Sequence, residues 1–413
     1  MYMYWAWGEE PTMKTITLGS TGITTPQNAF GALPIQRIST DEAVRLLHRA
    51  YEGGMTFFDT ARAYSDSEEK VGIAFEGMRD RVTIATKSGA KDPESLASDL
   101  ETSLALLKTD HVDIYQFHCA DRVYRPGDGT GMYEAMQEFK RQGKIGHIAI
   151  TAHKIGVAED AVASGLYETL QFPLSYLATP REEALVEACA KANMGFIAMK
   201  GLAGGLLHNS RACMAYMTKF DNVVPIWGVQ KESELDEWLS YMDQGTPALD
   251  EETLAFIASE RAELTGNFCR GCGYCMPCPM HIAINQCARM SLMLRRAPSQ
   301  AWLSEHWQAE MAKVDSCVEC GLCMTRCPGL AIFTVDESGE RARVSFPYEY
   351  VPLPREGDTV TCTDRDGRAL TPGTVVRVRQ SPAFDHTAVV TVDIPKELGM
   401  QVRFIDRSSI PGR

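Results

Sequence analysis

The sequence has no apolar run that approaches the ~18 residues a membrane-spanning helix needs, so we expect no membrane span. It has no block rich in Lys or Arg, and its formal net charge is −13 at pH 7. Because binding to nucleic acid requires a basic face that neutralises phosphates, nucleic acid is excluded as a partner. Residues 1–12 are apolar but lack a basic segment and a cleavage site, which excludes a signal peptide and favours a tail. We therefore expect a cytoplasmic protein.

Cysteine, by contrast, is abundant, with 13 in 413 residues. Eight of the 13 form two runs, Cys269–Cys278 and Cys317–Cys327, mostly with gaps of two residues. Such clustering indicates metal ligation rather than a disulfide framework, and it suits a reducing, anaerobic cytoplasm. The length exceeds that of one ordinary domain, and 45% hydrophobic residues suffice for a sizeable core. We expect two or three domains.

Short apolar runs alternate with amphipathic segments through the first 244 residues, which indicates a parallel sheet with helical connections. Eight such units favour a closed (β/α)8 TIM barrel over an open sheet. No GxGxxG follows the first strand, which disfavours a Rossmann domain. Residues 14–27 are expected to form a hairpin that plugs the barrel floor. The expected strands lie near 29–34, 55–60, 82–87, 112–118, 145–151, 170–174, 195–200 and 223–228, with helices that include 41–52, 93–108, 132–144 and 182–192.

Four polar residues follow three successive apolar runs of this predicted barrel. Asp59 ends the run MTFF, Tyr64 comes five residues later, and Lys87 and His118 end the runs VTIAT and VDIYQF. Chemistry on a (β/α)8 barrel takes place where strands end and loops begin. A phenol beside an ammonium is a candidate general acid for carbonyl reduction, because the ammonium lowers the phenol's pKa from its usual value of about 10. A polar cluster that only closes the barrel mouth is the structural alternative.

The stretch FFDTARAYSDSE resembles the aldo-keto reductase signature FFDTAxxYxxSE, and the similarity extends from about Lys14 to Gln244. The resemblance implies an enzyme that reduces a carbonyl or oxidises an alcohol. It implies that Tyr64 is the general acid or base, that Lys87 makes the phenol acidic, and that Asp59 holds Lys87. His118 would donate a hydrogen bond to the carbonyl oxygen and orient the substrate.

The same resemblance implies a nicotinamide cofactor, either NADP(H) or NAD(H). The sequence departs from the family pattern on this side: Met199 stands where an aromatic residue stacks on nicotinamide. Gln230 and Lys231 stand where a basic pair clamps the 2′-phosphate, and Trp238 replaces a later Asn. The expected cofactor contacts are Thr151, His153, Gln171, Met199, Lys200, Gly228 and Lys231.

Two cysteine runs follow the barrel, as C-x2-C-x2-C-x2-C-P at 269–279 and C-x2-C-x2-C-x3-C-P at 317–328. Thiolates are soft ligands, and this spacing is typical of [4Fe-4S] clusters. The second run resembles that of bacterial ferredoxins, in which the fourth cysteine of each run serves the other cluster. The resemblance implies one cluster on Cys269, Cys272, Cys275 and Cys327 and another on Cys317, Cys320, Cys323 and Cys278. Two structural zinc sites are the alternative.

From residue 338 on, β-branched alternation with Gly-Asp and Asp-Gly turns predicts a small antiparallel β domain that resembles a barrel. The expected domains are a tail at 1–12, an aldo-keto reductase barrel at 13–261, a ferredoxin-like domain at 262–337 and the β domain at 338–413. Cys119, directly after His118, is expected to point to the opposite side of its strand and to take no part in catalysis.

Together these features predict an iron-sulfur oxidoreductase that acts on a small carbonyl or alcohol. The two clusters would be structural, would feed one-electron chemistry in the barrel, or would exchange electrons with a ferredoxin or flavoprotein partner. The alternative is a non-catalytic barrel that serves as a redox sensor or as the scaffold of an electron-transfer subunit. The presence of all four polar residues favours the enzyme.

Overall fold

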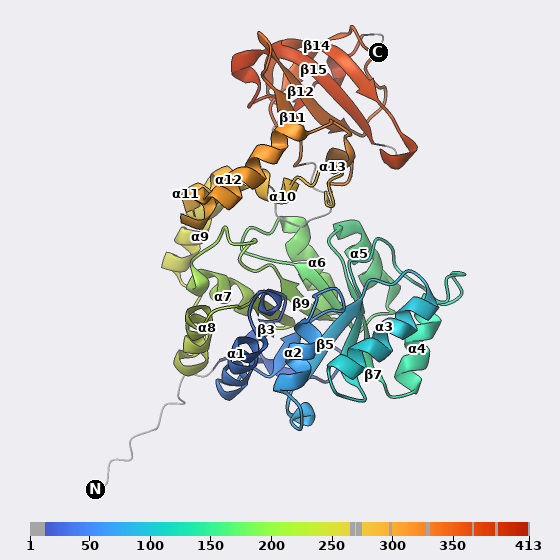
Figure 1. Cartoon of the computed structure of the whole chain (residues 1–413), viewed down its shortest axis with the longest axis vertical. Helices are drawn as coiled ribbons and strands as arrows, with labels where there is room; N and C mark the ends of the chain where they lie inside the picture. The colour runs from blue at the N-terminus through green and yellow to red at the C-terminus, as the bar shows by residue number, and fades with distance from the viewer. Residues whose placement is uncertain are drawn as a thin grey trace. The chain divides into compact units, whose positions relative to one another are not determined.

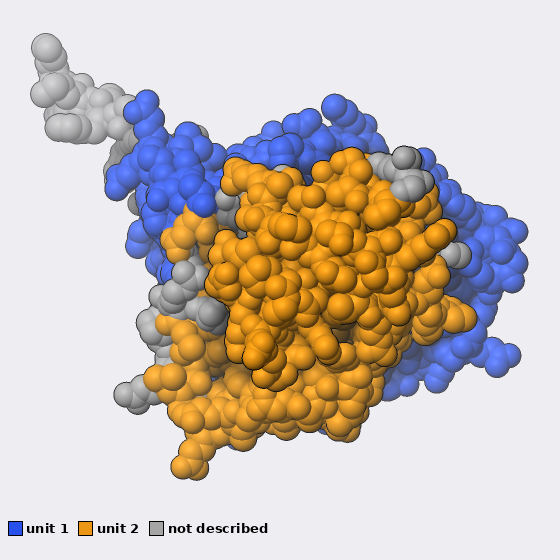
Figure 2. Space-filling view, turned by 90° about the horizontal axis from the view of Figure 1, so that it is seen from above, with its two compact units in different colours: residues 1–262 blue, residues 263–413 orange. Residues whose placement is uncertain are grey.

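The structure is a computed structural model that describes residues 13–264, 269, 275–296, 300–327, 331–365, 367–384 and 387–411. The chain divides into two compact units, residues 1–262 and 263–413 (Figure 2). The expected tail at 1–12 lies outside the described residues. Among the helices described, none combines the length and the hydropathy that crossing a bilayer requires.

The first unit is built on a closed barrel of eight parallel strands (Figure 1). Each strand pairs with the next one along the chain, and the last strand pairs with the first to close the barrel. The strands are β3 (Ala29–Gly31), β4 (Phe57–Asp59), β5 (Thr83–Ser88), β6 (Val112–Phe117), β7 (Ile145–Thr151), β8 (Thr169–Pro173), β9 (Gly195–Met199) and β10 (Val223–Gly228). All eight overlap the apolar runs, so the predicted (β/α)8 barrel is confirmed.

Helices connect the strands and surround the barrel (Figure 1). A capping box fixes the start of the first one, because the Ser39 hydroxyl accepts from the N–H of Glu42 and the Glu42 carboxylate accepts from the N–H of Ser39. The helices are α1 (Thr40–Glu52), α2 (Ser67–Ala74), α3 (Pro93–Leu106), α4 (Met132–Arg141), α5 (Ile155–Ser164), α6 (Pro180–Lys191), α7 (Ser210–Thr218), α8 (Glu232–Gln244) and α9 (Glu251–Leu264).

A hairpin closes the floor of the barrel, as predicted. Strands β1 (Thr15–Thr17) and β2 (Thr24–Pro26) pair antiparallel. Beyond β1, Leu18 is fully buried, and its side chain contacts Gly195 at the start of β9. Ile16 and Leu18 belong to a single apolar cluster with residues of seven barrel strands, namely Ala29, Phe57, Ala85, Ile114, Ala149, Ile197 and Val224.

The second unit joins short helices to a six-stranded antiparallel sheet of order β11-β12-β15-β14-β13-β16. Alternate residues of β12 and β15 bury one face around a core that includes Val344, Phe346, Val390 and Val392. The strands are β11 (Thr334–Asp336), β12 (Arg341–Tyr348), β13 (Thr359–Thr363), β14 (Ala369–Arg379), β15 (Ala388–Pro395) and β16 (Phe404–Ile405). The α-helices are α10 (Ile284–Cys287), α11 (Met290–Arg296), α12 (Glu305–Ala312) and α13 (Leu322–Thr325).

The described strands of this sheet do not close into the barrel-like form that the sequence predicts. The sheet has two ends, β11 and β16, with only 3 and 2 residues. Edge strands this short offer few backbone N–H and C=O groups that could hydrogen-bond to each other and close the sheet into a barrel. For the same reason they offer little surface for pairing with the strands of another chain. The antiparallel β domain is confirmed, whereas its boundary at residue 338 stays a prediction.

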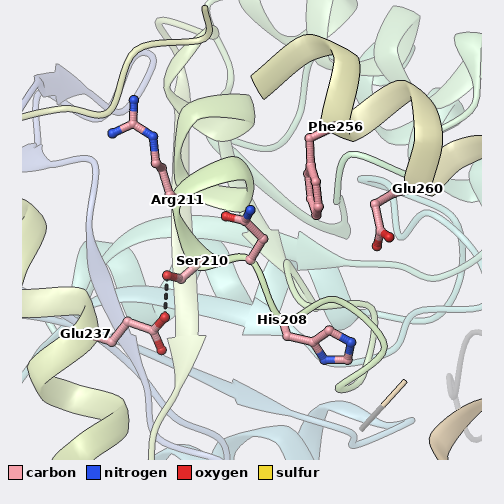
Figure 3. A pocket seen from close by; sticks show the side chains of 7 residues that line it. His208, Ser210, Arg211, Glu237, Phe256 and Glu260 are labelled. Atoms are coloured by element: carbon pink, nitrogen blue, oxygen red, sulfur yellow. Dashed lines mark hydrogen bonds between the residues drawn. The ribbon is translucent and has the colours of Figure 1, made fainter. Parts of the chain in front are cut away.

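A surface pocket of about 480 Å³ lies beside the start of α7, with α8 and α9 on its other sides (Figure 3). Within it, Ser210 Oγ donates to the Glu237 carboxylate at 2.5 Å, and the Asn209 side chain caps α7. The lining residues are His208, Asn209, Ser210, Arg211, Glu237, Phe256 and Glu260. None of the four predicted catalytic residues lines it, so the pocket is distinct from the predicted site.

Replacing Leu18 by Ala should destabilise the barrel, because a fully buried side chain would leave a cavity at the floor. Such changes cost about 2–5 kcal/mol. We expect the free energy of unfolding of the barrel, measured by urea titration, to fall by that amount. The exposed Thr17→Ala is the matched control and should change it by less than about 0.5 kcal/mol. Equal stability of Leu18→Ala and wild type would contradict the plug.

Candidate active site and cysteine module

The four predicted catalytic residues meet at the mouth of the barrel. Asp59 is the last residue of β4, Lys87 lies in β5, and His118 directly follows β6. Tyr64 lies in the loop between β4 and α2. Because the carboxyl ends of neighbouring parallel strands share one rim, three strands and one loop bring these side chains together.

Asp59 and Lys87 form a buried ion pair, with 2% and 1% of their side chains exposed. Lys87 Nζ donates to Asp59 Oδ1 and, at 2.7 Å, to the carbonyl oxygen of Thr60. Asp59 Oδ2 accepts from the side-chain amides of Gln116 at 3.1 Å and Gln171 at 2.9 Å. A buried ion pair is tolerated when its remaining polar atoms are hydrogen-bonded, and the two glutamines meet that condition.

Tyr64 and His118 lie beside this ion pair. Their rings meet edge to face with centroids 5.7 Å apart. Lys87 Nζ lies 5.3 Å from the centroid of the Tyr64 ring. The structure therefore brings together all four side chains that the sequence singles out, although their catalytic roles stay a prediction.

The direction of the pKa shift of Tyr64 differs from the prediction. Burial raises the pKa of Tyr64, and the Asp59 carboxylate raises it further. The sequence predicts that Lys87 lowers this pKa, whereas the net shift in the structure is upward. Burial also lowers the pKa of Lys87, and Asp59 opposes that shift. At neutral pH Tyr64 is thus a protonated phenol.

His118 is a neutral imidazole at neutral pH. Burial lowers the pKa of His118 to about 3, and the charges of Lys87 and His153 act in the same direction. Burial, followed by the charge of Lys200, lowers the pKa of His153 to about 3 as well. A neutral imidazole still donates one N–H, so His118 can donate a hydrogen bond to a substrate oxygen without adding a charge.

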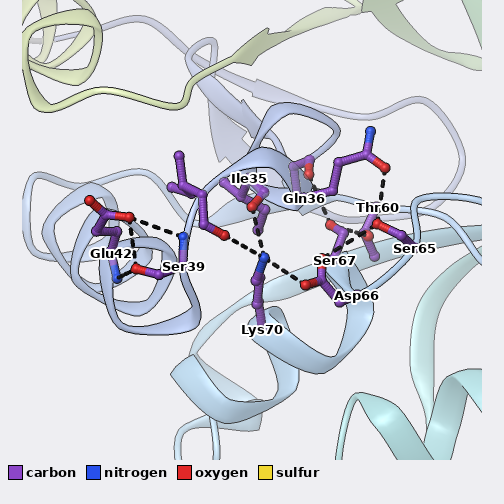
Figure 4. A network of polar contacts seen from close by, with 11 residues as sticks. Ile35, Gln36, Ser39, Glu42, Thr60, Ser65, Asp66, Ser67 and Lys70 are labelled. Atoms are coloured by element: carbon purple, nitrogen blue, oxygen red, sulfur yellow. Dashed lines mark hydrogen bonds and ion pairs between the residues drawn. The ribbon is translucent and has the colours of Figure 1, made fainter.

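The loop that carries Tyr64 is fastened to the segment after β3 by a network of polar contacts (Figure 4). Ser67 Oγ donates to the carbonyl oxygen of Ala32 at 2.8 Å. Lys70, which is 2% exposed, pairs with Asp66 at 2.8 Å and donates to two carbonyl oxygens of the β3–α1 segment. These contacts hold the C-terminal end of the loop, three residues after Tyr64, against the segment after β3.

Glu68 fastens the same loop to β5. It is fully buried, accepts from Thr86 Oγ1 at 2.6 Å and pairs with Arg62. Thr86 directly precedes Lys87, so the loop and the strand are held together. Neither Glu68 nor Gln116 was predicted as a site residue. The Ser-Glu pair of the signature was a signal for Glu68, whereas the sequence alone does not reveal the contacts of the glutamine.

Cys119 lies at the site, contrary to the prediction that it points away. β6 ends at Phe117, and Cys119 has a φ of +50°, so strand alternation no longer sets the direction of its side chain. The charge of a Cys119 thiolate would raise the pKa of both Tyr64 and Lys87, which indicates that the thiol is near them. The N–H of Cys119 donates to Thr151 Oγ1 at 2.7 Å.

The predicted nicotinamide contacts lie at or after the ends of the last four strands, but several are engaged inside the protein. Gln171 donates to Asp59, and Thr151 accepts from Cys119. The backbone N–H of Lys231 donates to the Glu234 carboxylate at 3.2 Å. The remaining predicted contacts follow or end the same strands, namely His153, Met199, Lys200 and Gly228. Three of the seven predicted contacts thus have a hydrogen-bond partner within the protein, and for Lys231 this partner engages only the backbone N–H.

The second cysteine run gathers with one cysteine of the first. Burial raises the pKa of Cys323 to about 11, and nearby Cys320, Cys317 and Cys278 act in the same direction. Cys278 belongs to the first run, so this cysteine lies near the second run, as the predicted exchange of fourth ligands requires. Cys272, another predicted ligand, lies outside the described residues.

Cys327, the last cysteine of the second run, likewise lies with a cysteine of the first run. Cys269 of the first run and Cys327 of the second belong to one buried apolar cluster. Three cysteine sulfurs accept a backbone N–H, at 3.4, 3.4 and 3.3 Å, namely Cys278, Cys317 and Cys327. Hydrogen bonds to the sulfurs stabilise thiolate charge and tune the potentials of iron–sulfur clusters.

In the part of the chain that the structure describes, no group of three or more Cys, His, Asp or Glu side chains could hold a single metal ion. Each thiolate of a [4Fe-4S] cluster binds a different iron, so cluster ligands stand farther apart than the ligands of one ion. A zinc site would instead gather four thiolates around one ion at about 2.3 Å. Eight thiol donors in two runs with gaps of two residues are typical of two [4Fe-4S] clusters.

Comparisons with known proteins assign the two parts of the chain. The model of the Aldo/keto reductase family matches residues 15–224, and that of the 4Fe-4S dicluster domain matches residues 268–330. The oxidoreductase YrpG of Bacillus subtilis (strain 168) is 31% identical over 227 residues, which cover 47% of this chain and 68% of that protein. The aldo-keto reductase YhdN of the same organism is 28% identical over 214 residues, which cover 47% of this chain and 64% of that protein.

Solved structures match the barrel. The holo form of an aldo-keto reductase from Bacillus halodurans has a TM-score of 0.53 at 20% identity, covering 60% of this chain and 96% of that one. An aldo/keto reductase from Klebsiella pneumoniae, in complex with NADP and acetate, has a TM-score of 0.53 at 21% identity, again covering 60% and 96%. At these identities the likeness shows the fold alone.

The low pKa of His118 predicts how stability depends on pH. An unfolded histidine binds a proton below about pH 6.5, whereas folded His118 does so only below about 3. Between these two pH values the unfolded state binds more protons than the folded state. The free energy of unfolding therefore increases as the pH rises from about 3 to about 6.5, and it decreases as the pH falls over the same range.

His118→Asn should therefore weaken the pH dependence of the free energy of unfolding between pH 6.5 and about 3. Urea titrations at a series of pH values measure it, and the exposed His208→Asn controls for the loss of a histidine. A slope in His118→Asn equal to that of wild type would contradict a buried neutral imidazole.

Proposed function

The chain belongs to the aldo/keto reductase family, and from that premise we propose that it interconverts a small carbonyl compound and its alcohol, with Tyr64 as the proton donor and acceptor. The observation that carries the proposal is the meeting of Asp59, Tyr64, Lys87 and His118 at the barrel mouth. The chain is an oxidoreductase of this family that also carries a 4Fe-4S dicluster domain.

Each of the four side chains has a role that its surroundings support. A carbonyl that is reduced develops negative charge on its oxygen, and an alkoxide is a stronger base than a phenolate. Tyr64, a protonated phenol, therefore transfers its proton to that oxygen as the charge develops. His118 donates its N–H to the same oxygen and orients it. Lys87, held by Asp59, places a positive charge beside the phenolate that remains.

The overall reaction takes up two electrons and two protons per carbonyl reduced, and a bound nicotinamide dinucleotide would supply both electrons and one of these hydrogens as hydride to the carbonyl carbon. Tyr64 delivers one proton to oxygen, and in the reverse direction it accepts that proton from the alcohol. Lys87 and Asp59 keep their own proton in place, because Asp59 Oδ1 accepts from the ammonium throughout. The chain's own residues thus account for the proton and for the charge on oxygen.

We propose that the cysteine module holds two [4Fe-4S] clusters with exchanged fourth ligands. Cys269, Cys272, Cys275 and Cys327 would hold one, and Cys317, Cys320, Cys323 and Cys278 the other. The grouping of Cys278 with the second run and of Cys269 with Cys327 supports this assignment. Bound clusters supply one-electron transfer, for which a ferredoxin or flavoprotein is the partner of matching chemistry.

Replacing Tyr64 by Phe removes the acidic proton and keeps the ring. We expect turnover of a panel of aldehydes and ketones to fall by about 10²–10⁴-fold, because that is what a positioned general acid contributes. The assay is anaerobic, with NADH, NADPH and dithionite as alternative reductants. Iron content and visible absorption should match those of the wild type.

Tyr51→Phe, a half-buried tyrosine on α1, is the matched control and should retain wild-type turnover. Wild-type turnover in Tyr64→Phe would contradict the proposal and favour a barrel that acts as a scaffold or redox sensor.

Replacing Cys317 by Ala should remove one cluster and leave the other. Iron, measured on anaerobically purified protein, should fall from about eight to about four atoms per chain. Cys362→Ala removes a buried cysteine of β13 and should leave the iron content unchanged. Retention of all iron in Cys317→Ala would contradict the ligand assignment.

A further inference from the structure

The start of α8 is the place where a phosphate would be expected to bind in this barrel. Barrels of this type frequently bind phosphate in the loops after the seventh and eighth strands, at a helix N-terminus whose N–H groups are unpaired. Here the seventh and eighth strands are β9 and β10, and α8 follows β10 after a short loop.

An internal carboxylate already occupies that position. The backbone N–H groups of Gln230 and Lys231 donate to Glu234 Oε2 at 2.9 and 3.2 Å. Glu234 belongs to the first turn of α8, where a negative charge is stabilised by the helix dipole. Two N–H groups at the entry to α8 therefore bind a side chain of the chain itself, and its carboxylate lies at the N-terminus of the helix.

The charges around this position also oppose a second anion. Glu232 lies in the same first turn as Glu234. The nearby Arg49 does not offset them for a ligand, because its guanidinium pairs with both Glu232 and Asp236. A phosphate at the start of α8 would displace Glu234 and meet its uncompensated charge.

A second, independent observation concerns the space beside this helix. The indoles of Trp227, on β10, and Trp238, on α8, are stacked with centroids 3.9 Å apart and an angle of 8° between their planes. Both residues are 2% exposed. Gly201, in the turn after β9, leaves room for Trp227, because a Cβ there would lie 2.4 Å from the indole. The chain's own aromatic rings thus fill the space between this turn and α8.

We propose that Glu234 closes the phosphate position after the eighth strand, so that the barrel excludes the 2′-phosphate of NADPH. The proposal rests on the proposed function, because it concerns the reductant of that reaction. What it claims is the relative affinity of the barrel for NADPH and NADH. Of the two nicotinamide dinucleotides, NADH lacks the 2′-phosphate and therefore places no such group at this helix. Glu234 is then a specificity-determining residue.

The test measures equilibrium binding of NADPH and NADH to the anaerobically purified, cluster-loaded full chain by isothermal titration calorimetry. Wild type should bind NADPH no more tightly than NADH. Glu234→Ala frees both N–H groups and removes the charge, so the affinity for NADPH should rise about tenfold while that for NADH stays within about twofold. Glu234→Gln keeps the shape of the cap without its charge and should raise the affinity for NADPH by a smaller factor.

Glu182→Ala is the matched control, because Glu182 accepts the N–H of Thr179 at 2.7 Å and so caps α6 in the same manner. It should leave both affinities unchanged. Tighter binding of NADPH than NADH by wild type, or an unchanged affinity for NADPH in both Glu234 variants, would overturn the proposal. Because no turnover is measured, a failure of Tyr64 as the general acid would leave this result unaffected.

Discussion

The buried pairing of Asp59 with Lys87 is the contact on which the barrel mouth depends. One carboxylate joins four strands, because Lys87 comes from β5, Gln116 from β6 and Gln171 from β8, while Asp59 itself ends β4. A charge at this depth is stable only with its full set of partners, and the loss of one leaves another buried and unpaired. The ion pair and the arrangement of the strand ends therefore depend on each other. The pair forms only when the ends of these strands are held in register.

The phenol is positioned by a separate set of contacts. Ser67 and Lys70 fasten the loop to the segment after β3, and buried Glu68 fastens it to β5. In its proposed role Tyr64 would be a weak acid at rest and still an effective one, because the burial that raises its pKa would also strengthen its interaction with a developing oxyanion. Catalysis in such a site comes from the fixed position of the proton rather than from an unusually acidic phenol.

The sequence was sufficient for what depends on periodicity and on strand ends. Eight apolar runs gave the barrel, and Asp59, Lys87 and His118 were found because parallel strands end at one rim. The sequence was insufficient for features that depend on how deeply a side chain is buried and on which groups it hydrogen-bonds to. The pKa of Tyr64 follows from how deeply the loop is buried, and the direction of Cys119 follows from a single backbone angle. Gln171 and Lys231 were open to a ligand by sequence, and only the structure reveals that internal groups hold the Gln171 side chain and the Lys231 backbone N–H.

The two halves of the chain differ in how they handle electrons. A nicotinamide delivers two electrons as hydride and needs only the barrel, whereas [4Fe-4S] clusters pass electrons one at a time. Within the second unit, Cys317 is exposed, whereas Cys269, Cys275, Cys278 and Cys327 are buried. A cluster on the second run would thus have a thiolate at the surface, where an external carrier can reach it, and a cluster on Cys269, Cys275 and Cys327 would be shielded. Under the proposals made above for Glu234 and for the two clusters, electrons would enter through the cluster on the second run rather than from NADPH.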